Sequence, residues 1–390
     1  MFKLDQVIKK ISFPLLAILL CFSFTSCQNS TDTTDTNDNK EVIETEKADD
    51  AKSDEKEVTE TDKEANKEDQ DKEDTNEEAK TIGDCCAQIS KEIFVSADYL
   101  KDVFDGKKDI KDYVIAEVTW GEDDASPDYL KNHIPGAIHI NTDSVEEGPV
   151  WNLKSDDEIV KSILNYGIDK DTTVFLYGPD SGVARVALAY LIEGVENIKI
   201  INGGIKAWMD KGYETESKAN KAVAKTDFKG EYPAHPELLV SLDQAIKDIE
   251  DKDENKQYIT TRTYEEYIGE TSGYTYIPKA GELPGAIYGH DEADYKNADG
   301  TYISYDDMVE MLKKEGVKLS KEMIFYCGTG WRAAIPVLKF YERGFKVKLF
   351  DGGWNEWQMH DELPVQLGDP KTDVKMTTVG ELSNDKAKKE

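Results

Sequence analysis

The chain has 390 residues, of which 80 are acidic and 48 are Lys or Arg, so its formal net charge at pH 7 is −32. Proteins bind nucleic acid mainly by neutralising phosphates with Lys and Arg, so this charge excludes nucleic acid as an expected partner. The length suits two or three ordinary domains. Five cysteines, at positions 21, 27, 85, 86 and 327, are too few and too clustered for a disulfide framework.

Residues 1–27 have the pattern of an export signal. Three lysines lie within the first ten residues, and an almost wholly apolar run follows over Ile11–Phe24. This run of 14 residues is too short for a comfortable membrane span, so it predicts the core of a secretory signal. The small residues Thr25-Ser26 followed by Cys27 resemble a bacterial lipoprotein signal, although Phe24 stands where that pattern prefers Leu.

The resemblance implies that Cys27 is lipidated and becomes the mature N-terminus. It predicts an exported protein, anchored to a membrane through this lipid at the cell surface or in the periplasm. The alternative is an ordinary cleaved signal with an incidental cysteine.

Residues 28–84 form an acidic linker in this interpretation. Residues 31–80 contain 21 acidic residues, 8 lysines and no aromatic residue. Such a segment cannot bury enough apolar surface to offset its chain entropy, so we expect a disordered tether. The adjacent Cys85 and Cys86 could form a strained disulfide, accept sulfur or have no role. Residues 371–390 are polar again, and we expect them to form a frayed tail.

Between these segments the sequence repeats itself. Three motifs return at a constant spacing of 149 residues: Ile134–Ile138 as Leu283–Ile287, Phe175–Gly178 as Ile324–Cys327, and Asn202–Gly204 with Trp208 as Asp351–Gly353 with Trp357. A constant spacing indicates two copies of one domain. We predict them over residues 88–218 and 236–368.

Strand and helix patterns alternate in the second copy. Apolar runs predict strands at Gln257–Thr261, Glu322–Tyr326 and Lys346–Phe350. Helical spacing occurs at Tyr305–Gly316 and Arg332–Arg343. Alternating strands and helices predict an α/β fold with a mostly parallel sheet flanked by helices.

Cys327 stands where the predicted strand Glu322–Tyr326 meets the next helix. The carboxyl end of a strand in such a sheet is where ligands bind. A short loop with glycines can point several backbone N–H groups at one atom, and the helix dipole and Arg332 add positive charge. These features favour a reactive thiolate at Cys327. The alternative is a buried, inert cysteine at a strand end.

The loop Cys327-Gly328-Thr329-Gly330-Trp331-Arg332 resembles the Cys-x-x-Gly-x-Arg loop of the rhodanese family, and both copies resemble rhodanese domains. The resemblance implies a tandem sulfurtransferase, active in the second copy and inactive in the first, where Gly178 replaces the cysteine. In that family the cysteine takes a sulfane sulfur from a donor such as thiosulfate or 3-mercaptopyruvate and becomes a persulfide. It then passes the sulfur to a thiol or cyanide-like acceptor.

The resemblance also implies site residues. Cys327 is the expected catalytic residue, and the expected donor-binding residues are Gly328, Thr329, Gly330, Trp331, Arg332 and Arg262. Arg262 matches a family arginine that faces the donor, although Thr260 and Glu282 replace an acidic residue and a histidine of the family pattern. An alternative for Arg262 is a solvated charge or an ion pair with Glu265 or Glu266.

Other chemistries have weaker support. Related phosphatase-type domains have five residues between Cys and Arg, whereas this loop has four, which favours sulfur transfer. The five histidines lack metal-ligand spacing and no phosphate-binding or dinucleotide motif occurs, so we expect no metal and no cofactor. The first copy should support the second, with Arg185 in a structural role rather than at an anion site. The competing function is a non-catalytic binding or sulfur-sensing module.

Overall fold

The computed structural model describes residues 91–126 and 128–389. The predictions for the export signal, for Cys27, for the acidic linker and for the Cys85-Cys86 pair lie outside these residues. Among the helices described, none is long and apolar enough to cross a membrane.

The first copy is built on a five-stranded sheet in which every neighbouring pair of strands is parallel, with the strand order β1-β7-β6-β2-β3. Helices α2 and α5 cover one face and α3 and α4 the other. The strands are β1 (Phe94–Val95), β2 (Tyr113–Thr119), β3 (Ile138–Asn141), β6 (Thr173–Tyr177) and β7 (Ile198–Ile201). The helices are α2 (Ala97–Phe104), α3 (Asp156–Asn165), α4 (Gly182–Glu193) and α5 (Gly204–Asp210).

The second copy repeats this topology as β10-β9-β11-β12-β8, again with parallel neighbours. Its strands are β8 (Leu239–Val240), β9 (Lys256–Thr260), β10 (Ile287–Tyr288), β11 (Glu322–Tyr326) and β12 (Val347–Phe350). Its helices are α6 (Leu242–Asp251), α7 (Tyr264–Tyr267), α8 (Tyr305–Lys314), α9 (Trp331–Tyr341) and α10 (Gly353–Trp357). The predicted fold class is confirmed.

Shorter elements complete the described chain. Two antiparallel hairpins are formed by β4 (Glu146–Glu147) with β5 (Asn152–Leu153), and by β13 (Pro364–Leu367) with β14 (Lys375–Thr378). The short 3₁₀ helices are η1 (Asp123–Ala125), η2 (Thr142–Ser144), η3 (Pro236–Leu238), η4 (Glu292–Tyr295) and η5 (Val379–Glu381).

Local sequence explains where these elements form. All five residues of β6 and four of the five in β11 are buried, as expected of central strands covered on both faces. Ser241 and Ser304 stand directly before α6 and α8, and each side chain accepts a hydrogen bond from a backbone N–H of the first turn. These N-caps satisfy donors that the helix leaves without partners.

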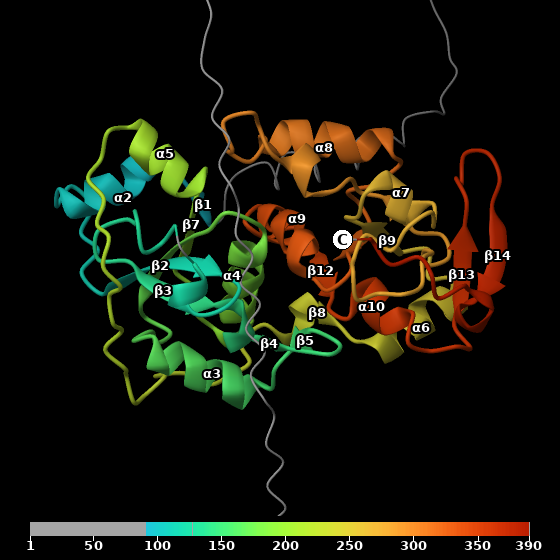
Figure 1. Cartoon of the computed structure of the whole chain (residues 1–390), viewed down its shortest axis with the longest axis horizontal. Helices are drawn as coiled ribbons and strands as arrows, with labels where there is room; N and C mark the ends of the chain where they lie inside the picture. Colours follow the sequence, from blue (N-terminus) through green and yellow to red (C-terminus); the bar gives the residue numbers. More distant parts are fainter. Residues whose placement is uncertain (1–90, 127, 390) are drawn as a thin grey trace, which may run out of the picture. The chain divides into compact units, whose positions relative to one another are not determined.

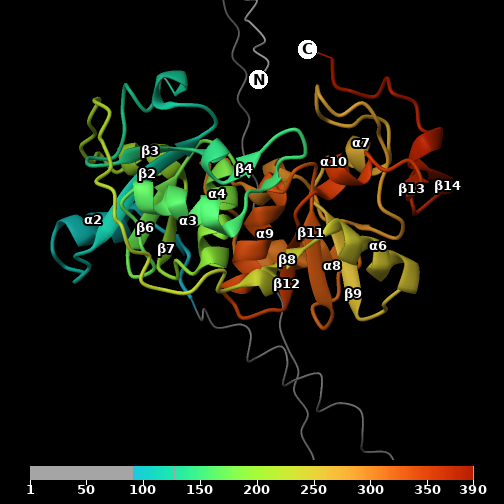
Figure 2. The ribbon, with the colours of Figure 1, turned by 90° about the horizontal axis from the view of Figure 1, so that it is seen from below.

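Helices α4 and α9 lie side by side and join the two copies (Figures 1 and 2). Every residue of α4 is buried, because one side of the helix packs on its own sheet and the other on α9. A helix that is apolar on all sides is suited to such a position. The exceptions to its apolar sequence are two buried charged residues, Glu193 at its last position and Arg185, which belongs to the site described below.

The β4–β5 hairpin of the first copy reaches the second copy (Figure 1). The Leu153 N–H donates to the Asp351 carboxylate at 2.9 Å, and the Asn355 amide donates to the Val150 carbonyl at 2.9 Å. Both contacts involve residues next to the turn that follows β12, so the hairpin touches the carboxyl end of the second sheet.

The C-terminal segment differs from the expected frayed tail. Strand β14 pairs with β13, and Val379 is fully buried in the same apolar cluster as Trp357 and Leu363. Further on, the Lys388 N–H donates to the Tyr274 carbonyl at 2.9 Å. The prediction was wrong because one well-placed apolar residue anchors a segment whose average composition is polar.

Candidate active site

Cys327 directly follows β11, and α9 begins four residues later. Its side chain is fully buried, and the Gly330 N–H donates to the Sγ atom across 3.2 Å. Gly330 has a φ of +88°, a conformation that favours glycine and turns the N–H toward the sulfur. Because α9 starts here, its first N–H groups have no acceptor within the helix and its dipole favours negative charge.

The Gly352-Gly353 turn after β12 packs against the backbone of this loop. The Trp354 N–H donates to the Cys327 carbonyl at 2.9 Å, and the Asn355 N–H donates to the Gly328 carbonyl at 3.0 Å. A Cβ atom on Gly353 would lie 2.5 Å from the Cys327 carbonyl oxygen, closer than atoms can approach. The glycine therefore permits the contact between turn and loop that holds Cys327 in place.

Two tyrosines between α7 and β10 cover the loop. A Cβ atom on Gly328 would lie 2.3 Å from the ring of Tyr274, so that ring rests directly on the loop backbone. Burial, and then the charge of Cys327, raise the pKa of Tyr276 to about 12 against an opposing hydrogen bond with Thr329. Burial also raises the pKa of Tyr274, with Cys327 and Glu266 adding to it. Both hydroxyl groups are therefore protonated at neutral pH.

Arg332 is held by two groups beside the loop. Its guanidinium donates to both oxygens of Glu266, at 2.8 and 2.9 Å, and to the Tyr274 hydroxyl at 2.8 Å. Burial alone would raise the pKa of Glu266, but the hydrogen bonds and charge of Arg332 lower it. The sequence predicts positive charge from Arg332 at the loop, and in the structure Glu266 balances that charge.

Arg262 is fully buried rather than solvated. Its Nη2 donates to the Glu282 carboxylate at 2.7 Å and to the Gly281 carbonyl at 2.6 Å, and its guanidinium lies 5.2 Å from the ring centre of Trp354. Its Nη1 has no hydrogen-bond partner among the described residues. The alternative pairing with Glu265 or Glu266 was wrong, because Glu282, which replaces the family histidine, supplies the carboxylate.

The first copy contributes directly to the loop of the second. The Trp331 indole donates to Glu146 on β4 at 2.6 Å. The opposite oxygen of Glu146 accepts from the fully buried Arg185 at 3.0 Å, and Arg185 also donates to Asp351 at 2.6 Å. A Cβ atom on Gly330 would lie 2.6 Å from the Arg185 guanidinium, so that group packs against the loop. These contacts match the supporting role predicted for the first copy.

The corresponding loop of the first copy has no room for a cysteine in its present conformation. A Cβ atom on Gly178 would lie 2.5 Å from the Val118 carbonyl oxygen. The two histidines of this copy have structural contacts: His133 is fully buried against the Tyr129 carbonyl, and His139 hydrogen-bonds Thr119 at 2.7 Å. Neither lies in the loop.

The sequence matches the Rhodanese-like domain family twice, over residues 96–211 and 241–360. The chain belongs to this family. It is 38% identical over 291 residues to the thiosulfate sulfurtransferase YnjE of Escherichia coli K12, covering 71% of this chain and 66% of that protein. It is 25% identical to thiosulfate/3-mercaptopyruvate sulfurtransferase 2 of Arabidopsis thaliana, over 71% of this chain and 87% of the relative.

Solved structures with the rhodanese fold are similar to the structure of this chain. The crystal structure of YnjE matches with a TM-score of 0.67 at 37% identity, over 71% of this chain and 68% of that one. The wild-type structure of EanB matches with a TM-score of 0.68 at 30% identity, over 73% of this chain and 71% of that one. Sulfur transfer is the general activity that these comparisons support for this rhodanese-family enzyme.

Sequence reasoning found the rhodanese loop but missed most of its surroundings. Tyr274, Tyr276 and Glu266 lie far from the loop in sequence and belong to no motif. Glu146 was missed for the same reason, since it comes from the other copy. One signal was present for Arg262: the replacement of a family histidine by Glu282 pointed to an acidic partner.

Proposed function

We propose that this protein transfers a sulfane sulfur through a persulfide on Cys327. The observation that carries the proposal is the 3.2 Å contact between the Gly330 N–H and the Cys327 sulfur at the start of α9. The thiolate attacks the transferable sulfur of the donor, a new S–S bond forms, and the donor's own bond to that sulfur breaks. With thiosulfate an S–S bond breaks and the leaving group is sulfite, which takes the bonding electron pair. With 3-mercaptopyruvate a C–S bond breaks, and the leaving group is the enolate of pyruvate, which takes the electron pair and then a proton. The acceptor then attacks the outer sulfur, and Cys327 leaves as thiolate.

The loop stabilises negative charge in both halves of this cycle. The thiolate and the persulfide are both anions, and the Gly330 N–H and the helix dipole face them before any reaction begins. The Tyr274 and Tyr276 hydroxyl groups remain protonated near the sulfur and are able to donate hydrogen bonds. Because Cys327 is fully buried, the side chains that cover the sulfur must move before a donor reaches it.

The ion pairs of Arg332 and Arg262 affect which sulfur donor the site would prefer. Arg332 is paired with Glu266, and Arg262 is paired with Glu282. The two arginines proposed to bind the donor therefore have little net positive charge to offer a dianion such as thiosulfate. We favour a donor with a single carboxylate, such as 3-mercaptopyruvate, whose binding needs fewer positive charges.

The experiment is mass spectrometry of the purified protein after incubation with each donor. A gain of one sulfur on the peptide that contains Cys327, about 32 Da, supports the proposal, and Cys327→Ser should abolish it. The ratio of kcat/KM between the two donors tests the preference. If neither donor loads Cys327 or is turned over, the rhodanese fold serves as a binding or sulfur-sensing module instead.

A structural neighbour supports a persulfide in this fold. One solved structure of an EanB variant, 30% identical to this chain, is of a cysteine persulfide in a tetrahedral intermediate state with ergothioneine. For this chain we propose a thiol or cyanide-like acceptor. The choice is testable by following loss of the extra sulfur from loaded Cys327 after addition of each acceptor.

We also propose that the protein is exported and anchored through a lipid on Cys27. The support is the apolar run that ends at Thr25-Ser26-Cys27. Expressed in bacteria, the full chain should partition into detergent, and Cys27→Ala should move it to the aqueous phase. An aqueous wild-type protein whose N-terminus is another residue would refute the anchor.

A further inference from the structure

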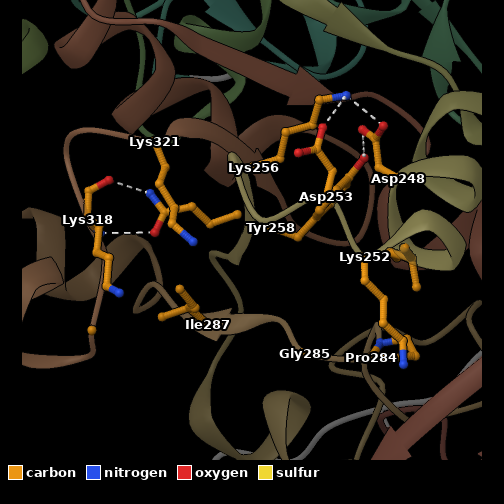
Figure 3. A pocket seen from close by; sticks show the side chains of 13 residues that line it. Asp248, Lys252, Asp253, Lys256, Tyr258, Pro284, Gly285, Ile287, Lys318 and Lys321 are labelled. Carbon is orange, nitrogen blue, oxygen red and sulfur yellow. Dashed lines mark hydrogen bonds and ion pairs between the residues drawn. The ribbon is translucent and has the colours of Figure 1, made fainter.

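A groove lies at the amino end of β9, beside the edge strand β10 (Figure 3). Its volume is about 420 Å³, and its walls include Pro284, Gly285, Ile287, Gly316 and four lysines. The groove is at the opposite end of β11 from Cys327, since Lys321 precedes that strand and Cys327 follows it. It is therefore separate from the sulfur-transfer site.

The corresponding groove of the first copy has a volume of about 470 Å³, and the chain itself forms one of its walls. Residues 220–225, which follow the first domain, run along the edge of β3, where Asn220 forms a parallel bridge with Ile138. The Lys225 N–H donates to the Leu164 carbonyl at 2.9 Å. The Val223 carbonyl oxygen lies only 2.6 Å from where a Cβ atom on Gly167 would be. An extended peptide thus runs along the β3 edge and lines the groove of the first copy.

In the second copy the equivalent peptide is missing from this position. Gly316 corresponds to Gly167 at the 149-residue spacing, yet no atom lies within 4 Å of where its Cβ would be. The chain parallels the first copy as far as Gln366, which accepts from the Gly285 N–H as Glu216 accepts from Gly136. It then turns into the β13–β14 hairpin. The described residues therefore leave the groove open.

The two grooves differ in charge. The groove of the second copy is lined by four lysines and by Asp248 and Asp253, both of which pair with Lys256. In the first copy, the Lys225 ammonium reaches Asp112 at 2.9 Å, Asp169 at 3.0 Å and the Thr172 hydroxyl at 2.6 Å. At the 149-residue spacing, Lys318 replaces Asp169 and Lys321 replaces Thr172.

Neither of these lysines has an ion-pair partner within the described part of the chain. In Figure 3 both lie beside Ile287, and no dashed line reaches either ammonium group. A segment that places a carboxylate where the first copy has Lys225 would pair with them. Salt-dependent attraction between such groups is strongest at low ionic strength.

We propose that this groove binds an extended acidic segment of a partner protein. The segment lies parallel to the β10 edge, as residues 220–225 lie along β3, and adds a strand to the sheet. Its carboxylates face Lys318 and Lys321, while small apolar residues pass over Gly316 and Ile287. Because Cys327 is at the other end of β11, a docked partner leaves the sulfur-transfer loop uncovered.

The test uses two synthetic 12-residue peptides and the full chain. The first has the sequence of residues 217–228, and the second replaces each of its three lysines by Glu. Both are labelled with a dye, and their binding is followed by fluorescence anisotropy at low salt. The wild type should bind the acidic peptide at least about tenfold more tightly than the basic one, a difference of about 1.4 kcal/mol.

Variants with exchanged charge make the test specific. The double variant Lys318→Asp with Lys321→Thr gives the second copy the residues that the first copy has at these positions. It should bind the basic peptide more tightly than the acidic one. Lys375→Asp changes the charge on β14 outside the groove and should keep the wild-type preference. Sulfur loading of Cys327 reports that each variant is folded. Equal binding of both peptides by the wild type, or the same reversal in the Lys375 variant, would overturn the proposal.

Discussion

The contact of Arg185 with the Cys327 loop makes a quantitative prediction about the first copy. Arg185 is fully buried and pairs with Glu146 and Asp351 at 3.0 and 2.6 Å. Arg185→Met fills similar space but leaves both carboxylates without their cation. Removing one partner of a buried ion pair costs about 3–5 kcal/mol, because a charge is left uncompensated in a low-dielectric interior. We expect a loss of that size in the free energy of unfolding.

The effect should extend to activity. The Arg185 guanidinium packs against Gly330, whose N–H donates to the Cys327 sulfur. A shift of the loop by a few tenths of an ångström weakens that bond, so we expect kcat/KM for sulfur loading to fall about tenfold, or about 1.4 kcal/mol.

Urea unfolding measures the stability and donor-dependent turnover measures the activity. A matched triple variant adds Glu146→Gln and Asp351→Asn, which removes the stranded charges and should recover most of the stability but not the activity. If the free energy of unfolding of Arg185→Met is within about 1 kcal/mol of the wild-type value, the cross-domain ion pairs contribute little to stability and the reasoning fails.

Three further changes test other parts of the structure. Arg332→Ala should destabilise the protein by about 3–5 kcal/mol, because Glu266 stays buried without its partner, whereas Arg332→Lys keeps the charge and should lose less in urea unfolding. Burial raises the pKa of Glu117 from 4.5 to about 7, so the native state prefers its protonated form and stability should fall as the pH rises through that interval. Glu117→Gln should remove this fall, which is about 3 kcal/mol at most; an unchanged pH profile in urea unfolding would contradict the cause. Gly178→Cys should not create a second sulfur carrier, since its Cβ atom would lie 2.5 Å from the Val118 carbonyl oxygen, and mass spectrometry should find no sulfur on that residue.

Repeats and local patterns were sufficient to predict the architecture. The spacing of 149 residues identified two copies, and the strand predicted at Glu322–Tyr326 has those bounds in the structure. Buried strands and helix ends are encoded by neighbouring residues, through apolar runs, capping side chains and glycines. The placement of Cys327 between a strand and a helix followed from the same local information.

The surroundings of Cys327 could not be predicted in this way. Arg332 was expected to add positive charge at the loop, but its partner Glu266, 66 residues away, was not predicted. The segment after residue 370 was expected to fray, yet Val379 is fully buried. In both cases the outcome depends on a contact between residues that are distant in sequence. Local composition does not predict such contacts.

By itself, the sequence determined the fold, the family and the proposed sulfur carrier Cys327, because these depend on short motifs whose geometry is local. Only the tertiary structure decided how charge is balanced around Cys327, which part of the first copy supports the loop, and that the described chain follows one of two equivalent sheet edges and not the other. The grooves at Gly167 and Gly316 share their glycine and their strand order. They differ because the chain continues along one sheet edge and turns away from the other, and the path of a chain through space is set by packing across the whole fold.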